Sequence, residues 1–134
     1  MNKRIVKSPK LYFYDTGLLC HLLGIKSLSA LQKSNVFGFI FENWIITEIK
    51  KNSHNAALNE PMYYFRDNVG NEVDLILERE GQPTAIEIKA AAKPNSAMLR
   101  GLNFWKRNQP NGTGILIHRG SSNEMIDNQL SLVP

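Results

Sequence analysis

The fold is decided by two stretches of sequence, Glu72-Val73-Asp74-Leu75-Ile76-Leu77-Glu78 and Thr84-Ala85-Ile86-Glu87-Ile88-Lys89. Both predict β-strands, because apolar and β-branched residues recur in them at a period of two. In the first strand, three apolar side chains are expected to share one face: Val73, Leu75 and Leu77. Asp74 is then expected on the opposite face beside Ile76, where a buried strand ordinarily carries no charge.

The second strand carries charge in the same way. Glu87 and Lys89 share one of its faces, while Ile86 and Ile88 share the other. Two carboxylates and one ammonium group would then meet on one face of a sheet. Carboxylate oxygens suit a divalent cation, and a lysine beside that cation suits cleavage of a phosphodiester bond. The sequence therefore predicts a catalytic and metal-binding site at Asp74, Glu87 and Lys89. The plainer alternative is an exposed sheet face whose Glu87–Lys89 ion pair contributes about 0–1 kcal/mol.

Size and composition set modest bounds on this protein. A chain of 134 residues fits one domain, and 43% hydrophobic with 21% charged residues is typical of globular proteins. The single cysteine, Cys20, cannot form an internal disulfide. A buried thiol in a reduced, cytoplasmic compartment is therefore favoured over a reactive nucleophile. No apolar stretch approaches the roughly 18 residues of a membrane span, so no membrane association is expected.

The charges are segregated along the chain. The net charge of +4 equals the contribution of four N-terminal residues: Lys3, Arg4, Lys7 and Lys10. Residues 60–87 contain seven acids against two arginines, whereas residues 88–123 contain six basic residues and no acid. An acidic cluster followed by a basic segment is what a metal site beside a phosphate-binding surface requires. Chance clustering on a solvated face is the alternative.

The hydrophobic periodicity gives a consistent order of elements. The predicted elements are an extended stretch over 10–14, a helix from Asp15 or Thr16 to Leu23, a helix over 37–51, strands over 62–66, 72–78 and 83–89, a helix from Asn95 or Ser96 to Arg107, and a strand over 114–118. Residues 26–35 predict a loop or a short helix, and residues 123–134 a short helix or a strand. We expect one α/β domain with three parts: an N-terminal extension and helix over 1–36, an αβββαβ core over 37–118, and a C-terminal tail over 119–134.

This order of helix, three strands, helix and strand resembles the core of the PD-(D/E)xK nuclease superfamily. Asp74 and Glu87-Ile88-Lys89 stand where that motif has its Asp and Glu-x-Lys, and Val73 replaces the nominal proline, which supplies no ligand. The resemblance implies a restriction-endonuclease-like fold around a mixed central sheet. It also implies that Asp74 and Glu87 hold Mg²⁺ or Mn²⁺ and that Lys89 lies beside the attacking water or the scissile phosphate. Glu42, on the first core helix, would complete the metal site.

A closer resemblance covers almost the whole chain. Five blocks in one order carry it: residues 10–18, 38–43, 63–66, 72–74 and 87–89. Together they are similar to the nuclease-like domain at the C-terminus of a family of prokaryotic AAA-type ATPases. This resemblance implies an ATPase partner, but no glycine-rich phosphate loop with Lys-Ser/Thr occurs in the sequence. The ATPase domain is therefore absent from this chain, which would be a fragment or a truncated relative.

Glu42 also stands out on the pattern of its helix. On a helical wheel it lies between Ile46 and Ile49, inside the apolar sector, where an unpaired carboxylate is costly. A bound metal or a nearby lysine would satisfy it. Alternatively, the helix is rotated so that Glu42 reaches solvent.

Three polar residues recur on the polar side of the second long helix: Arg100, Asn103 and Arg107. They are candidate phosphate contacts, with a solvated face as the alternative. The three histidines are scattered without ligand spacing, so none is expected to bind metal.

The leading hypothesis is a Mg²⁺-dependent nuclease-type domain that hydrolyses phosphodiester bonds in DNA. The competing hypothesis is a non-catalytic module that binds DNA or a partner for an ATPase.

Overall fold

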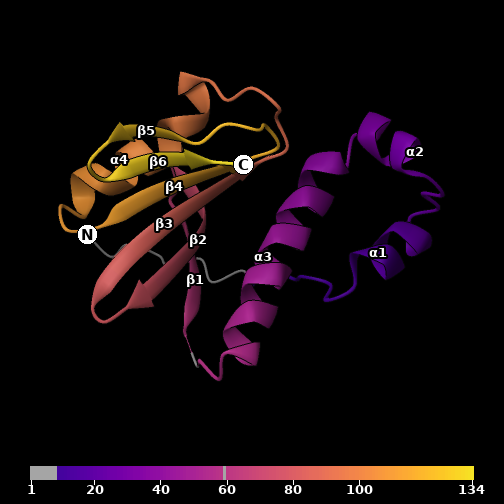
Figure 1. The fold of residues 1–134 in the computed structure, drawn as a ribbon, viewed down its shortest axis with the longest axis horizontal. Helices are drawn as coiled ribbons and strands as arrows, with labels where there is room; N and C mark the ends of the chain where they lie inside the picture. The colour runs from indigo at the N-terminus through magenta and orange to yellow at the C-terminus, as the bar shows by residue number, and fades with distance from the viewer. Residues whose placement is uncertain (1–8, 59) are drawn as a thin grey trace.

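The computed structural model describes residues 9–58 and 60–134, which form a mixed α/β fold around one six-stranded sheet (Figure 1). Its strands are β1 (Met62–Arg66), β2 (Glu72–Arg79), β3 (Gln82–Lys89), β4 (Thr113–His118), β5 (Glu124–Asp127) and β6 (Leu130–Val133). Its helices are α1 (Thr16–Leu22), α2 (Leu28–Lys33), α3 (Phe37–Asn55), the single 3₁₀ turn η1 (Ser96–Leu99) and α4 (Arg100–Asn108). The predicted order of helix, three strands, helix and strand is confirmed.

Helices α1 and α2 lie on the side of α3 that faces away from the sheet (Figure 1). The Asp15 side chain caps α1 by accepting the Leu18 N–H at 3.0 Å, as the sequence predicted. Gly24 ends this region with a φ of +70°, a conformation that favours glycine. Residues 26–35, left as loop or short helix by the sequence, form α2 with Ser27 as its cap.

The sheet has the strand order β1-β2-β3-β4-β6-β5. Strands β1, β2 and β3 are antiparallel, and β2 turns into β3 through Glu80 and Gly81, which both have positive φ as a two-residue hairpin requires. Helix α4 connects β3 to β4, which pair in parallel. The last two strands extend the sheet, since β6 pairs in parallel with β4 and β5 in antiparallel with β6. The C-terminal residues are therefore part of the sheet and not a separate tail.

Each face of the sheet buries one apolar cluster. The cluster beneath α4 contains Val73, Ile76, Ala85, Leu102, Leu116, Leu130 and Leu132. The cluster beneath α3 contains Phe41, Ile46, Leu75, Leu77, Ile86 and Ile88. The shared face of Ile86 and Ile88 is as predicted. The prediction that Val73 shares a face with Leu75 and Leu77 is wrong, because Val73 packs under α4.

A β-bulge in β2 explains the position of Val73. Tyr63 pairs with Ile76 and Phe65 with Val73, so two residues of β2, Asp74 and Leu75, lie opposite Tyr64 alone. The extra residue breaks the simple alternation and brings Val73 to the same side as Ile76. The site residue Asp74 therefore sits at an irregularity of the strand, which the alternation of the sequence could not reveal.

Helix α4 approaches β2 closely at its first turn. A Cβ atom at Gly101 would lie 2.1 Å from the backbone oxygen of Glu72 and 3.2 Å from Oε2 of Glu87. Only glycine leaves room for this contact. The start of α4 is thereby held against both strands that carry the predicted site.

Candidate functional site

The three strand residues predicted to act together do lie together. Lys89 Nζ forms a close ion pair with Glu87 Oε1 and lies 3.8 Å from Asp74 Oδ2. The same Asp74 oxygen accepts the backbone N–H of Ile88 at 2.9 Å. The backbone pairing of β2 with β3 ends at Leu75, which pairs with Ile86. Beyond that residue, at the bulge, the hydrogen bond from the Ile88 N–H to Asp74 connects the two strands. We refer to Asp74, Glu87 and Lys89 as the sheet half of the site.

Glu87 is buried under α4 although it is ionisable, with only 6% of its surface exposed. Its second oxygen, Oε2, is buried and has no hydrogen-bond partner among the described residues. Burial and then the nearby charge of Asp74 raise the pKa of Glu87 to about 7, against the opposing effect of Lys89. Burial likewise raises the pKa of Asp74, although the Ile88 N–H partly offsets it. The sheet half is therefore a buried acid pair in need of positive charge.

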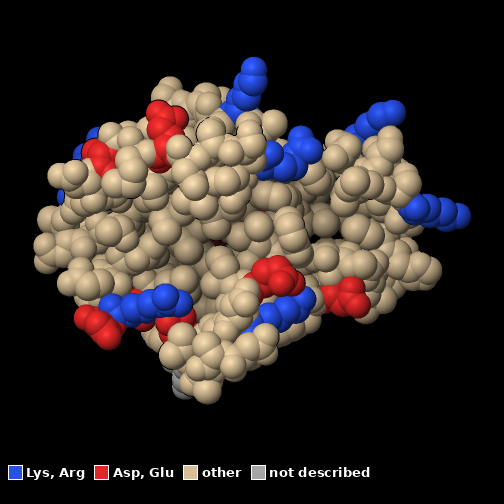
Figure 2. Space-filling view, in the orientation of Figure 1, with Lys and Arg blue, Asp and Glu red and all other residues tan. Residues whose placement is uncertain are grey.

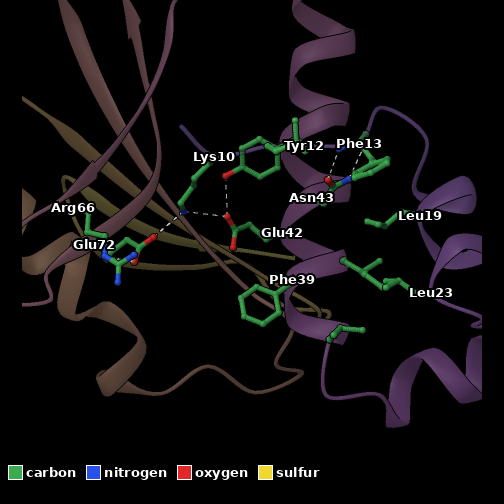
Figure 3. Close-up of a pocket in the computed structure, with 13 residues that line it drawn as sticks. Lys10, Tyr12, Phe13, Leu19, Leu23, Phe39, Glu42, Asn43, Arg66 and Glu72 are labelled. Atoms are coloured by element: carbon green, nitrogen blue, oxygen red, sulfur yellow. Dashed lines mark hydrogen bonds and ion pairs between the residues drawn. The ribbon is translucent and has the colours of Figure 1, made fainter. Parts of the chain in front are cut away.

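A second lysine enters the site from the N-terminal segment, residues 10–14. Lys10 Nζ lies 2.8 Å from Glu72 Oε1 and 3.3 Å from Glu42 Oε1 (Figure 3). It also lies 3.8 Å from Asp74 Oδ1. Tyr12 donates its hydroxyl to Glu42 Oε1 at 3.0 Å. We refer to Lys10, Glu42 and Glu72 as the segment half. Glu42 thus has the nearby lysine that its place on the helical wheel required, and Asp74 contacts both lysines.

These contacts shift the ionisation of the two segment residues. Burial opposes the charged form of Lys10, but the hydrogen bond to Glu72 and the charge of Glu42 outweigh it and raise the pKa of the lysine. Burial and the charge of Glu42 raise the pKa of the Tyr12 hydroxyl. Lys10 therefore stays an ammonium ion and Tyr12 stays a hydrogen-bond donor at neutral pH.

One buried side chain of α3 holds the N-terminal segment in place. Asn43 Oδ1 accepts the Phe13 N–H at 2.7 Å, and Asn43 Nδ2 donates to the Phe13 carbonyl at 2.8 Å (Figure 3). The side-chain amide thereby binds the segment as a neighbouring strand would. The sequence alone did not reveal four members of the site: Lys10, Tyr12, Glu72 and Asn43. The carboxylate of Glu42 in an apolar sector was the one signal that pointed to them.

Two clefts lie on either side of this segment. One, of about 580 Å³, is lined by Lys10, Tyr12 and Glu42 together with apolar residues of α1 and α3 (Figure 3). The other, of about 400 Å³, is lined by Lys10, Tyr12 and Asp74 together with residues of β1 and α3. Glu87 and Lys89 line neither of these two clefts. The predicted site is thus reached from solvent past the N-terminal segment or along Lys89, whose side chain is about one-third exposed.

In residues 9–58 and 60–134, no three Asp, Glu, His or Cys side chains converge closely enough to hold a metal ion as they stand. Lysine ammonium groups lie between the carboxylates instead. The donors are nevertheless of the hard oxygen type that Mg²⁺ and Mn²⁺ prefer, and the orphaned Oε2 of Glu87 lacks a positive partner.

His118 is buried, and its Nδ1 accepts the Gly120 N–H at 2.9 Å. No helix in the described part of the chain is long and apolar enough to cross a membrane.

The predicted phosphate contacts lie on α4. Arg100, Asn103 and Arg107 are all exposed, and Arg100 directly precedes Gly101, which packs on Glu87. Arg107 lies about 10 Å further along the helix, given a rise of ~1.5 Å per residue. Lys106, between them, pairs with Asp127 at 2.6 Å. On the face drawn in Figure 2, basic and acidic side chains lie next to each other along the lower edge, and several basic side chains project at the top and right.

Comparison with known proteins places the chain in a family. The model of the family described as "Domain of unknown function (DUF4143)" matches residues 37–134, which run from α3 to β6. The model described as "Domain of unknown function (DUF8612)" matches residues 1–29. The first match begins where the core was predicted to begin and includes the two C-terminal strands.

Two mycobacterial proteins are similar to this chain. They are "Uncharacterized protein Rv2008c" of Mycobacterium tuberculosis and "Uncharacterized protein Mb2031c" of Mycobacterium bovis. Each is 37% identical over 97 residues, which make up 71% of this chain and 21% of the relative. The chain thus covers about a fifth of the length of these relatives. Because the first family model spans the helix, the sheet and the carboxylate cluster, the chain belongs to the family described as Domain of unknown function (DUF4143).

Proposed function

We propose that this domain is a metal-dependent nuclease of the PD-(D/E)xK type that hydrolyses phosphodiester bonds in DNA. One observation carries the proposal: Asp74 and Glu87, on adjacent strands, converge on one cation, the ammonium of Lys89, while Glu87 Oε2 remains buried and unpaired. A buried acid pair that shares one ammonium group is unusual in a structural sheet, where such groups cost stability. Perturbed acids of this kind cluster at functional sites.

Asp74 and Glu87 would hold the Mg²⁺ or Mn²⁺ ion, with Glu42 as a further carboxylate. The bound ion would supply a water of lowered pKa and positive charge for the phosphate in the transition state. The bulge and the Ile88 N–H fix the Asp74 carboxylate before any ligand arrives. Glu87 must lose its proton to act as a ligand, and its raised pKa makes cation binding strengthen as the pH rises through about 7.

Lys89 would orient the attacking water or contact the scissile phosphate. Its side chain is the most exposed member of the sheet half, so it is the member that can reach a substrate. Arg100 at the start of α4, with Asn103 and Arg107 beyond it, would contact the DNA backbone. The resemblance to domains of prokaryotic AAA-type ATPases supports a cytoplasmic setting and an ATPase partner that is not part of this sequence.

A second function, a non-catalytic module that binds DNA or a partner for an ATPase, is favoured by a different observation. Lys10 and Lys89 already provide counter-charge for the carboxylates, as they would in a site whose role is structural. Such a domain would bind its partner through the exposed residues of α4 or the apolar cleft beside α1. It would have no need of a divalent cation.

Calorimetric titration with Mn²⁺ and a DNA-cleavage assay separate the two functions. The wild type is expected to bind Mn²⁺ and to nick DNA until chelator is added. Asp74→Ala should lose binding and cleavage together, whereas Lys89→Ala should retain binding and lose most of the cleavage rate. Lys33→Ala, at an exposed lysine at the end of α2, is the control and should change neither. Absence of both binding and cleavage in the wild type would instead favour the non-catalytic module.

A further inference from the structure

We propose that Lys10 is a tethered counter-cation that competes with a divalent metal ion for the carboxylates, and that the N-terminal segment must lift for that ion to bind. This inference rests on the proposed function and extends it to regulation of the same site. The ammonium of Lys10 lies within 4 Å of three carboxylates contributed by α3 and β2: Glu42, Glu72 and Asp74. It therefore engages Glu42 and Asp74, two of the three carboxylates proposed to hold the metal ion, and competes for their oxygens.

The charges of the cluster favour such an exchange. Four carboxylates, at Glu42, Glu72, Asp74 and Glu87, surround two ammonium groups, so the fully ionised cluster keeps an excess of negative charge. Arg66, 3.8 Å from Glu72 and largely exposed, screens only the outer edge. A divalent ion would replace the single charge of Lys10 by two and would balance the cluster more completely. Lys10 thus keeps the acids together while it is bound and gives way to a stronger cation.

The segment can leave without unfolding the domain. Residues 10–14 belong to no helix or strand, and neither edge strand of the sheet pairs with them. Polar contacts hold them to α3 and β2 through the Lys10 ion pairs, the Tyr12 hydroxyl bond to Glu42 and the two bonds to Asn43. The Tyr12 ring also packs on the apolar cluster under α3, and Lys10 lies over the Tyr64 ring. Lys10 and Tyr12 line both neighbouring clefts, so their departure would join these clefts above the carboxylates. A region with few buried contacts opens at low free-energy cost.

Two variants of the 134-residue chain test the inference by independent routes. Lys10→Met removes the charge and keeps the apolar stem, whereas Asn43→Ala weakens the attachment of the segment and keeps every charge. Lys26→Met, at an exposed lysine just after α1, is the matched control. Each protein is checked by circular dichroism and titrated with Mn²⁺ alone in a calorimeter. Melting is then recorded with chelator and with Mn²⁺.

Lys10→Met is expected to bind Mn²⁺ about tenfold more tightly than the wild type, and Asn43→Ala about threefold more tightly. Both should melt at lower temperature in chelator and recover more than the wild type when Mn²⁺ is added. Unchanged or weaker affinity in both variants, with a wild type that binds Mn²⁺, would overturn the inference and leave the proposed function intact. A gain in Lys10→Met alone would refute the lifting of the segment. No Mn²⁺ binding by any variant would overturn the inference together with the metal-dependent function.

Discussion

The two lysines of the site reach the same aspartate by different routes. Lys89 belongs to β3, where it pairs with His118 of β4, and the neighbouring Ile88 N–H donates to Asp74. Lys10 comes from a segment outside the sheet, and its contacts with Glu42 span 32 residues of sequence. The sheet half is therefore held within the sheet, while Lys10 of the segment half reaches the site through a few contacts from outside the sheet. The Asp74 carboxylate thus contacts one lysine that belongs to the sheet and one that belongs to a segment outside it.

This difference predicts a graded response to substitution. Changes in the sheet half should lower the global free energy of unfolding, because the hydrogen bonds and packing there belong to the sheet. Changes in the segment half should mainly alter local opening of residues 10–14, which hydrogen exchange detects.

The largest effect is expected from Asp74→Ala. This change leaves the buried Ile88 N–H without its acceptor and deprives both lysines of a shared partner, so the free energy of unfolding should fall by about 3 kcal/mol. Asp74→Asn, which keeps an acceptor oxygen, should lose less than half as much. Urea denaturation measures both. Equal losses would show that the hydrogen bond to β3 contributes little.

Gly101→Ala should destabilise the domain by about 2 kcal/mol, since a methyl group would meet the Glu72 carbonyl and force α4 away from β2. Gly38→Ala is the matched control, because a Cβ there meets no atom within 4 Å and its φ is not positive. The free energy of unfolding in urea distinguishes them. A stable Gly101→Ala protein would mean that α4 can shift without disturbing the sheet half.

A gradual change in stability is expected from pH. The pKa of Glu87 is about 7 in the folded protein and 4.5 for an unperturbed glutamate, so the folded state keeps a proton that the unfolded state releases. This group therefore stabilises the fold fully below pH 4.5, and its contribution is lost as the pH rises through about 7. Glu87→Gln should flatten the stability profile over that range in metal-free buffer. If Glu87→Gln and the wild type had the same dependence of stability on pH, the pKa of Glu87 would not be raised by burial.

Tyr12→Phe probes how residues 10–14 are attached to Glu42 of the segment half. It removes the hydroxyl bond to Glu42 and should cost about 1 kcal/mol, seen mainly as faster amide exchange in residues 10–14. Tyr14→Phe is the control in the same segment, because its ring is half exposed. If exchange accelerated throughout the sheet as well, the two halves would not be separable.

The smallest effect on stability should come from replacing Arg100 and Arg107 together by alanine, since both are exposed. DNA affinity should nevertheless fall similarly for all sequences, and the salt dependence should flatten by about two units of slope. The pair Lys26→Ala and Lys33→Ala, outside α4, should keep the wild-type slope. An unchanged slope in the arginine variant would assign those residues to a solvated face.

The sequence predicted the sheet half well because its signal is local. Alternation of apolar and charged residues places Glu87 and Lys89 on one face, and the short turn at Gly81 makes β2 and β3 neighbours. The same periodicity predicted helices α3 and α4 and the positions of the first four strands along the chain. It missed the bulge, because one additional residue in a strand leaves no mark in the pattern of hydrophobicity.

The segment half could not be predicted in the same way. Lys10 and Asn43 act through contacts between residues some 30 positions apart in the sequence, and such contacts have no periodicity. The parallel pairing of β6 with β4 was missed for the same reason, since the sequence of residues 123–134 fits a helix or a strand equally. Glu42 in an apolar sector indicated that a positive partner was needed, but not which one.

The bulge at Asp74 makes the length of β2 matter more than its composition. Removing one residue there would restore simple alternation, and Glu72 and Val73 would then turn to the opposite side of the sheet. The backbone oxygen that meets Gly101 would shift with them. Homologous sequences should therefore tolerate exchanges of apolar residues along β2, yet keep a constant number of residues between Glu72 and the turn at Gly81. Insertions and deletions should accumulate instead in the loop that joins α3 to β1.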